Sequence, residues 1–99
     1  MTKHIIPINP EPNQSFEIDL NGQQCDFKFL TRGTFLYMYL KVNKKDFIDG
    51  IICLNGNNLI QKSYGGFKGK IYFEDTQGDL PPIYYGLNDR WILYYEDES

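Results

Sequence analysis

The stretch from Gly69 to Tyr95 reads GKIYFEDTQGDLPPIYYGLNDRWILYY and contains three short aromatic segments. They span residues 69–74, 83–85 and 91–95, and turn-forming residues such as Asp75–Gly78 and Pro81–Pro82 separate them. Aromatic and β-branched residues favour strands, whereas glycine, proline, asparagine and aspartate interrupt them. The last third of the chain therefore predicts three strands and an all-β fold.

A hairpin is predicted near the start of the chain, where Asn21-Gly22 separates two alternating segments, Phe16–Leu20 and Cys25–Phe29. Asn-Gly tolerates the positive φ angles of a type I′ turn, so it is a strong hairpin signal. A two-residue loop fixes the register and puts the apolar residues on one face. The expected pairs are Leu20 with Gln23, Ile18 with Cys25 and Phe16 with Phe27. The same register places Glu17 opposite Asp26, which is mildly unfavourable.

The segment Phe35–Val42 is apolar on both alternating faces. Leu36, Met38, Leu40 and Val42 form one face, and Phe35, Tyr37 and Tyr39 form the other. Such a strand lies at the centre of a sandwich or barrel, or its outer face meets a partner. Residues 47–54 predict the next strand, with Asp49-Gly50 as a bulge.

The 99 residues predict a single domain. We expect a small barrel or sandwich of about seven or eight short, mainly antiparallel strands, because turn signals recur every ~8–12 residues. Residues 1–14 predict an extended, proline-containing N-terminal arm, residues 63–66 a flexible loop, and residues 96–99 an acidic tail.

The composition excludes several classes of protein. The net charge is −3 and the isoelectric point about 5.0, which argues against a nucleic-acid partner held through phosphates. No stretch has the ~18 apolar residues of a membrane span, so no membrane partner is expected. Met1–Ile8 does not resemble a signal peptide, which predicts synthesis in a cytosol without classical export. Cys25 and Cys53 are expected to be reduced, buried thiols.

The residues give little indication of catalysis, and no catalytic, cofactor or metal site is expected. His4 is the single histidine, and Cys25 has no basic partner near it in the sequence. The carboxylates of Glu74, Asp75 and Asp79 do not follow the spacing of a calcium loop and predict a solvated turn. Lys68 and Lys70 alternate with Phe67 and Tyr72, a pattern that single-strand binders use. A freestanding binding module for single-stranded nucleic acid, or an inhibitor of a host protein, is therefore the alternative function.

The excess of tyrosine calls for a surface role. The chain has eight tyrosines, and the doublets 84–85 and 94–95 cannot point wholly inward if they lie on strands. Tyrosine is common at protein interfaces because it is both apolar and polar. The predicted interface residues are Tyr37, Tyr39, Tyr84, Tyr85, Tyr94 and Tyr95.

The order of these elements resembles the small plug proteins of contractile-tailed phage and prophage baseplates. The residues that carry the resemblance are Ile5–Pro10, Gln14–Phe16, Leu20–Gln23, Arg32, Leu36–Met38, Val42–Asn43, Ile48–Cys53, Asn58–Ile60, Phe67–Gly69, Asp75–Gly78, Tyr84–Leu87 and Arg90–Tyr95. Together they span residues 5–96, although the last strand has Leu93-Tyr94-Tyr95 where Leu-Val-Tyr would be expected.

This resemblance implies a structural component of the virion rather than an enzyme. Such a protein would lie at the central axis of the tail baseplate and help to close the tube or seat the hub. Its partners would be copies of itself, in a symmetric oligomer, and the hub and tail-tube proteins. The family offers no catalytic or cofactor residues to transfer to this chain.

Overall fold

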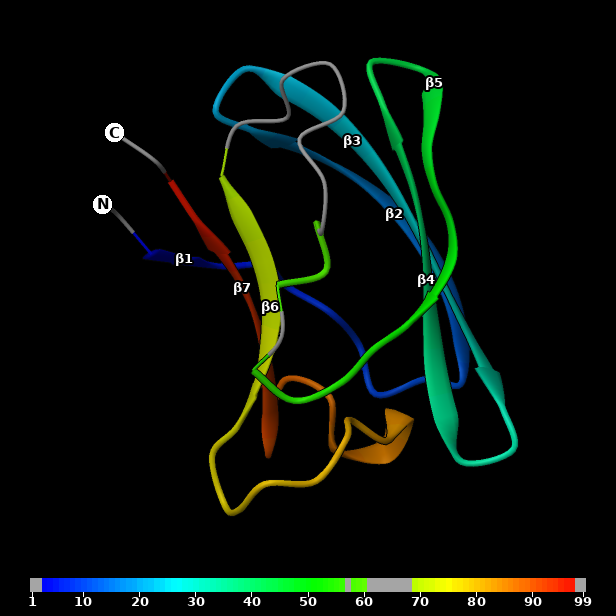
Figure 1. Cartoon of the computed structure of the whole chain (residues 1–99), viewed down its shortest axis with the longest axis vertical. Helices are drawn as coiled ribbons and strands as arrows, with labels where there is room; N and C mark the ends of the chain where they lie inside the picture. Colours follow the sequence, from blue (N-terminus) through cyan, green and yellow to red (C-terminus); the bar gives the residue numbers. More distant parts are fainter. Residues whose placement is uncertain (1–2, 57, 61–68, 98–99) are drawn as a thin grey trace.

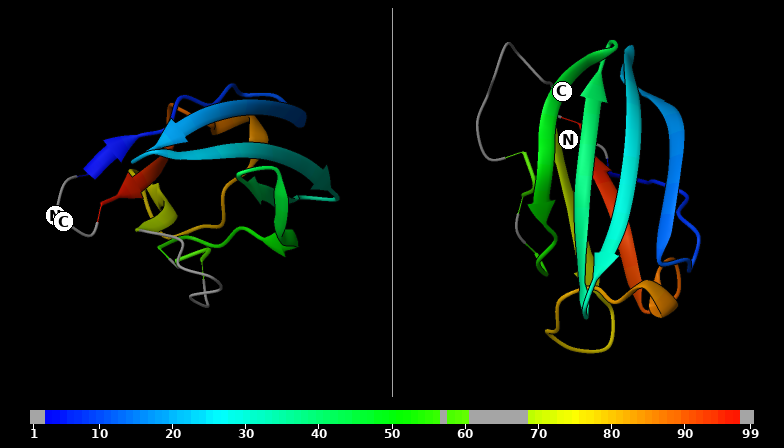
Figure 2. Two further views of the ribbon diagram at one scale, coloured as in Figure 1. Left: turned by 90° about the horizontal axis from the view of Figure 1, so that it is seen from above. Right: turned by 90° about the vertical axis from the view of Figure 1, so that its right-hand side faces the viewer.

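Two antiparallel sheets face each other in the computed structural model, which describes residues 3–56, 58–60 and 69–97 (Figure 1). The three-stranded sheet has the order β1 (Lys3–Ile5), β7 (Trp91–Glu96) and β6 (Lys70–Asp75). The four-stranded sheet has the order β2 (Asn13–Leu20), β3 (Gln23–Arg32), β4 (Phe35–Val42) and β5 (Lys45–Ile52). The all-β prediction is confirmed, and the fold is a sandwich, seen as two layers in Figure 2.

The β2–β3 hairpin has the predicted register, with Phe16 opposite Phe27, Ile18 opposite Cys25 and Leu20 opposite Gln23. Asn21 and Gly22 adopt φ angles of 56° and 80°, as a type I′ turn requires. The register also places Glu17 opposite Asp26, so the predicted like-charge pair is present.

Strand β4 is confirmed with both of its expected faces. Leu36, Met38 and Leu40 are buried, whereas Phe35, Tyr37 and Tyr39 point outward. The predicted bulge is present in β5, because Met38 pairs with Ile51 and Tyr39 with Asp49, leaving Gly50 unpaired. Gly50 has φ of +83°, and a Cβ atom there would lie 3.1 Å from the Tyr39 ring. Glycine therefore lets the backbone pass close to this ring.

The N-terminal segment joins the two sheets. β1 pairs with β7, and the Ile6 amide then donates to the carbonyl oxygen of Leu93 at 2.8 Å. Ile6 and Ile8 are fully buried, and β2 begins at Asn13. The segment expected to be an arm is thus extended, but its apolar side chains belong to the core because burying them is favourable.

Residues 55–56 and 58–60 cover the outer edge of β6 and pair with hydrogen-bonding groups that it would otherwise present. The side-chain oxygen of Asn55 accepts from the Asp75 amide at 2.8 Å, and that of Asn58 accepts from the Ile71 amide at 3.2 Å. The Leu59 amide donates to the Ile71 carbonyl oxygen at 2.7 Å. Two asparagine side chains therefore act as backbone substitutes along this edge. The loop expected at 63–66 lies outside the described residues.

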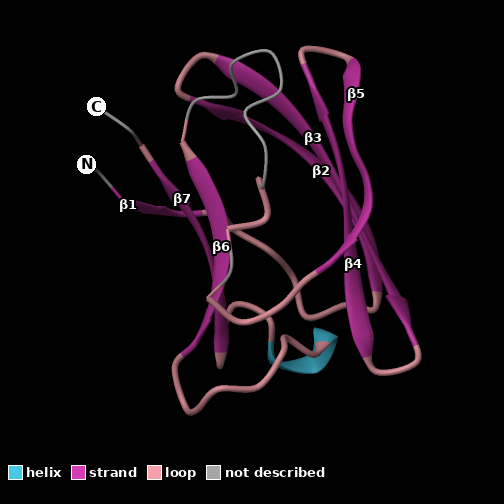
Figure 3. Ribbon diagram, viewed as in Figure 1, coloured by secondary structure: helices cyan, strands magenta, loops and turns pink. Residues whose placement is uncertain are grey.

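The expected strand at residues 83–85 is wrong: Tyr84–Gly86 form a short 3-10 helix, η1 (Figure 3). The Gly86 amide donates to the Ile83 carbonyl oxygen at 3.0 Å, which closes the turn. A Cβ atom on Gly86 would lie 2.4 Å from the Trp91 ring, so the backbone turns directly against the indole. Three residues are too short a segment to separate strand from helix by periodicity.

The core lies between the two sheets and consists mainly of aromatic and aliphatic side chains. Phe27, Phe29, Phe73, Trp91 and Tyr95 are its largest members, and each is at most 1% exposed. Within the described part of the chain, no helix is long and apolar enough to cross a membrane.

Candidate functional site

A partly buried ion pair organises the loops at one end of the sandwich. Arg90 donates from Nε to Asp75 Oδ1 at 2.7 Å and from Nη2 to Asp75 Oδ2 at 2.8 Å. The backbone amides of Gln77 and Leu80 donate to the same carboxylate at 2.9 and 3.0 Å. Asp75 therefore has four donors, and its side chain has no exposed surface. The prediction of a solvated turn is wrong for this residue.

The ion pair positions the aromatic residues of this end. The Arg90 guanidinium stacks 4.6 Å above the Trp91 ring, and Trp91 Nε1 donates to the Leu80 carbonyl oxygen at 3.0 Å. The loop 76–83, η1 and the β3–β4 turn all lie at this end (Figure 1). Leu80 and Tyr85 are 52% and 67% exposed. We call Leu80, Tyr84 and Tyr85 the loop end.

The Asp75–Arg90 pair predicts a specific dependence of stability on pH. Hydrogen bonds from Arg90 hold the pKa of Asp75 well below its ordinary value. A lowered folded-state pKa gives stability that is complete above the unfolded pKa, near 4, and is lost as pH falls toward the folded value. Asp75→Asn is expected to destabilise the chain at pH 7. The difference from the native chain should shrink steadily between about pH 5 and pH 2 in urea unfolding followed by circular dichroism. A constant difference over that range would contradict the assignment.

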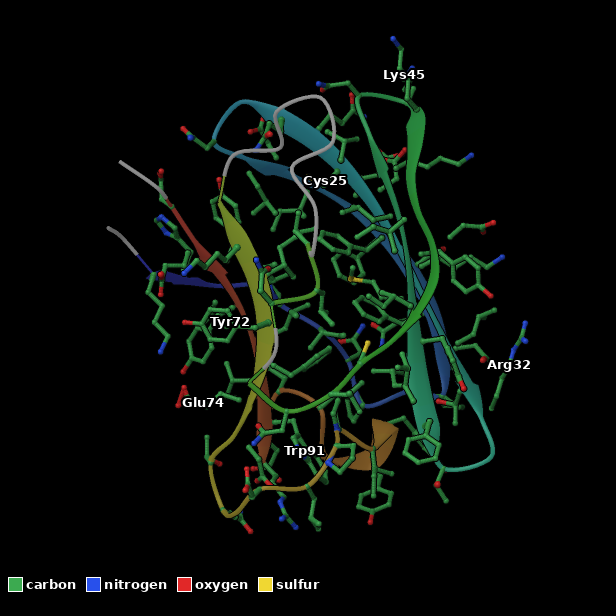
Figure 4. All side chains as sticks on the ribbon, viewed as in Figure 1. Cys25, Arg32, Lys45, Tyr72, Glu74 and Trp91 are labelled. Carbon is green, nitrogen blue, oxygen red and sulfur yellow. The ribbon has the colours of Figure 1, made fainter. Side chains whose placement is uncertain are left out.

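The outer side of the three-stranded sheet carries the first aromatic surface, which we call the β7 face. The rings of Tyr72 and Tyr94 lie 5.7 Å apart, and Lys3 Nζ lies 4.0 Å from the Tyr94 ring centroid. Lys3 also approaches Glu74 at 3.4 Å. Figure 4 shows Tyr72 and Glu74 on the outer side of β6. Ile5 of β1, which is 57% exposed, pairs with Tyr94 of β7.

The outer side of the four-stranded sheet carries the second aromatic surface, the β4 face, made of Lys28, Leu30, Arg32, Tyr37 and Tyr39. Lys28 Nζ lies 5.7 Å from the Tyr39 ring, and the Arg32 guanidinium lies 5.9 Å from the Tyr37 ring. Arg32 Nη2 also donates to the Tyr39 hydroxyl at 3.4 Å. Cations placed over aromatic rings make a surface that is apolar at its centre and polar at its rim.

The six predicted interface tyrosines do not form one surface. Tyr37 and Tyr39 lie on the β4 face and Tyr94 on the β7 face, on opposite outer sides of the sandwich. Tyr84 is half-buried against the core and Tyr85 is exposed, both at the loop end. Tyr95 is 1% exposed and packs between the sheets, because its strand alternates and Tyr94 takes the outward position.

The groups with nucleophilic or metal-binding chemistry are not arranged for either use. Burial, with the carboxylates of Asp19 and Asp26, raises the pKa of the Cys25 thiol to about 11, so the thiolate form is scarce near neutral pH. Burial also raises the pKa of Cys53. Both cysteines are buried free thiols, as predicted. Among the described residues, no three His, Cys, Asp or Glu side chains gather as metal ligands.

Sequence reasoning missed two features of these surfaces. Tyr72 was identifiable, because a strand over 69–74 paired with the last strand places Tyr72 beside Tyr94. The Asp75–Arg90 pair had no local signal, since 15 residues separate its members and only the closing of the loop brings them together. The alternation that suggested single-strand binding includes Phe67 and Lys68, which lie outside the described residues.

Comparison with known protein families identifies one that covers nearly the whole chain. A family model described as the cyanophage baseplate Pam3 plug gp18 matches residues 3–98, nearly the whole chain. A search of curated proteins finds no significant match. The resemblance found in the sequence is confirmed, and the chain belongs to the family of phage baseplate plug proteins that the cyanophage Pam3 plug gp18 represents.

Proposed function

We propose that this chain is a plug in the tail baseplate of a phage or prophage virion. It works by packing against neighbours, which are copies of itself and the hub and tail-tube proteins, rather than by catalysis. It is made in the cytoplasm of the bacterial host and then enters the assembling tail. Membership of the plug family supports the placement in the baseplate. The exposed aromatic surfaces of this chain support the proposed contacts with neighbours.

One observation carries the proposal: both outer faces of a small sandwich are aromatic. The inner faces already provide a complete core, so Tyr37, Tyr39, Tyr72 and Tyr94 are not needed to fill it. A protein that functions alone normally covers its outer sheet faces with polar residues. Aromatic residues at the centre of a polar rim are typical of protein interfaces. Two such faces and the loop end suit a component with neighbours on several sides.

The direct test is mass spectrometry of purified tail-like particles from an induced culture of the source strain. We expect this chain at a few copies per particle, together with hub and spike proteins. Its absence from well-formed particles, with the protein free in the cytosol, would contradict the proposal and favour a freestanding binding module.

Tyr85 at the loop end is the predicted contact that separates assembly from folding. Tyr85 is 67% exposed, and its ring packs edge-on against Tyr84 and Trp91, with centroids 5.9 and 6.4 Å away. Tyr85→Ala is expected to lower incorporation into particles at least about tenfold, as loss of an interface hot spot does. The free energy of unfolding should change by less than about 1 kcal/mol.

Tyr85→Phe is the matched control, because it keeps the ring and should retain most incorporation. The interface role is wrong if Tyr85→Ala unfolds the isolated domain while the remaining folded protein assembles normally.

A further inference from the structure

The β4 face carries opposite charges at its two ends. Glu17 and Asp26 face each other across β2 and β3 at one end, and Arg32 lies at the far end of β3. Six residues separate Asp26 from Arg32 along the strand, which corresponds to about 20 Å. Lys28, Leu30, Tyr37 and Tyr39 occupy the space between these ends, with Lys28 on the side of the carboxylates.

One carboxylate oxygen at this end of the face has no hydrogen-bond donor in the described part of the chain. Asp26 Oδ1 is buried and has no hydrogen-bond partner among the described residues, and its cross-strand neighbour Glu17 has the same charge. Lys41 on β4 lies opposite Asp26 on β3. The row formed by Glu17, Asp26 and Lys41 therefore holds two carboxylates and one positive charge. All three residues line a hollow of about 530 Å³, which opens on the outer side of the sheet. A buried acceptor without a donor is costly, so this end suits an incoming cationic donor.

The arginine end lacks a carboxylate. The Arg32 guanidinium donates to the Tyr39 hydroxyl and lies near the Tyr37 ring, and no carboxylate among the described residues lies within 4.0 Å of it. Figure 4 shows Arg32 pointing away from the sandwich. The other arginine of the chain, Arg90, is already bound to Asp75. The guanidinium fork is well suited to a carboxylate pair across an interface.

We propose that the β4 face binds a second copy of this chain, with Arg32 of each copy entering the Glu17–Asp26 hollow of the other. A two-fold axis between the two faces, crossing β3 at the level of Phe29, produces both contacts at once. Such an interface must be self-complementary, and this face meets that requirement because opposite charges lie on either side of an apolar centre. Packed sheets are about 10 Å apart, a gap that an arginine and a carboxylate side chain can bridge together.

The size of the face is consistent with a modest dimer. About a tenth of the accessible surface of 5769 Å², or roughly 580 Å² per copy, would be buried, at the low end for specific interfaces. The dissociation constant is therefore expected to lie in the micromolar range. The inference deepens the proposed function and rests on it for the biological setting, whereas its test uses the purified chain alone.

The test is sedimentation velocity from about 1 µM to about 500 µM chain at low salt. The native chain is expected to dimerise in this range. Arg32→Glu and Glu17→Arg are each expected to raise the dissociation constant at least about tenfold, because each places like charges together at both contacts. The double variant Arg32→Glu/Glu17→Arg reverses both charges and should return to within about threefold of native. Lys70→Glu makes the same change in charge on the outer side of the other sheet and should leave the dissociation constant unchanged.

A native chain that stays monomeric at the highest concentration overturns the inference, as does a double variant that is folded but fails to dimerise. Circular dichroism checks folding, and Arg32→Gln, which removes the charge without reversing it, replaces Arg32→Glu if the latter misfolds. If the native chain is monomeric and Arg32→Glu instead lowers incorporation into particles, the face binds another baseplate protein, and the proposed function stands without the dimer. If the chain dimerises but is absent from particles, the proposed function fails while the contact stands.

Discussion

Replacing Trp91 with alanine is expected to lower the free energy of unfolding by about 3–5 kcal/mol. Trp91 is 1% exposed and is the largest side chain of the core. Its loss removes the ring against which Gly86 turns, the platform for Arg90, and the donor to the Leu80 carbonyl. The cavity left in the core and the loss of the contacts that hold the loop end therefore both lower the free energy of unfolding.

Ile92→Ala is the matched control, because Ile92 is the next residue of β7 and points to the outer side. Ile92→Ala should lower the free energy of unfolding by about 1 kcal/mol, because the Ile92 side chain is only partly buried. Both variants are compared by urea unfolding followed by far-ultraviolet circular dichroism. Tryptophan fluorescence cannot be used, because Trp91 is the only tryptophan of the chain. Equal losses for the two positions would contradict the assignment of Trp91 as the link between the loop end and the core.

The doublet Tyr94-Tyr95 is expected to separate folding from assembly within two adjacent residues. Tyr95→Ala empties a position between the sheets and should cost about 3–5 kcal/mol, which is comparable to other large aromatic side chains in cores. Tyr94→Ala loses only contacts on the β7 face, with Lys3 and the Tyr72 ring, and should cost about 1–2 kcal/mol.

Incorporation into tail particles, measured for the folded molecules of each variant, is expected to rank Tyr94→Ala and Tyr95→Ala in the opposite order. Tyr94→Ala should lower incorporation into tail particles at least about tenfold while the monomer remains folded. Tyr94→Phe, which keeps the ring, is the control for Tyr94. If Tyr94→Ala assembles as the native chain does, the β7 face is not a contact surface of the particle.

Much of the four-stranded sheet could be predicted from local pattern. Asn21-Gly22 has only a few favourable backbone conformations, so it fixed the hairpin register down to the Glu17–Asp26 pair. The two-faced segment 35–42 and the Asp49-Gly50 bulge follow equally from alternation. Period-two alternation determines which residues share a face, and here it also assigns Tyr37 and Tyr39 to the outer side.

The C-terminal third shows where such reasoning failed. Residues 83–85 look like a strand but form η1, because packing of Gly86 against Trp91 overrides the local preference of two tyrosines. The six tyrosines that composition grouped together are distributed over two faces, the loop end and the core. Composition counts side chains, but strand parity and sheet pairing decide where each one points.

The sequence by itself determined the all-β class, the register of the β2–β3 hairpin, the absence of a local catalytic motif and the membership of the plug family, because these depend on neighbours along the chain and on the order of elements. Only the tertiary structure decided that the sheets form a sandwich, that Asp75 and Arg90 clamp the loop end, and that Arg32 and the Glu17–Asp26 pair lie at opposite ends of one face. Contacts between residues far apart in the chain form only when the whole core closes, and no local pattern encodes the distances between them.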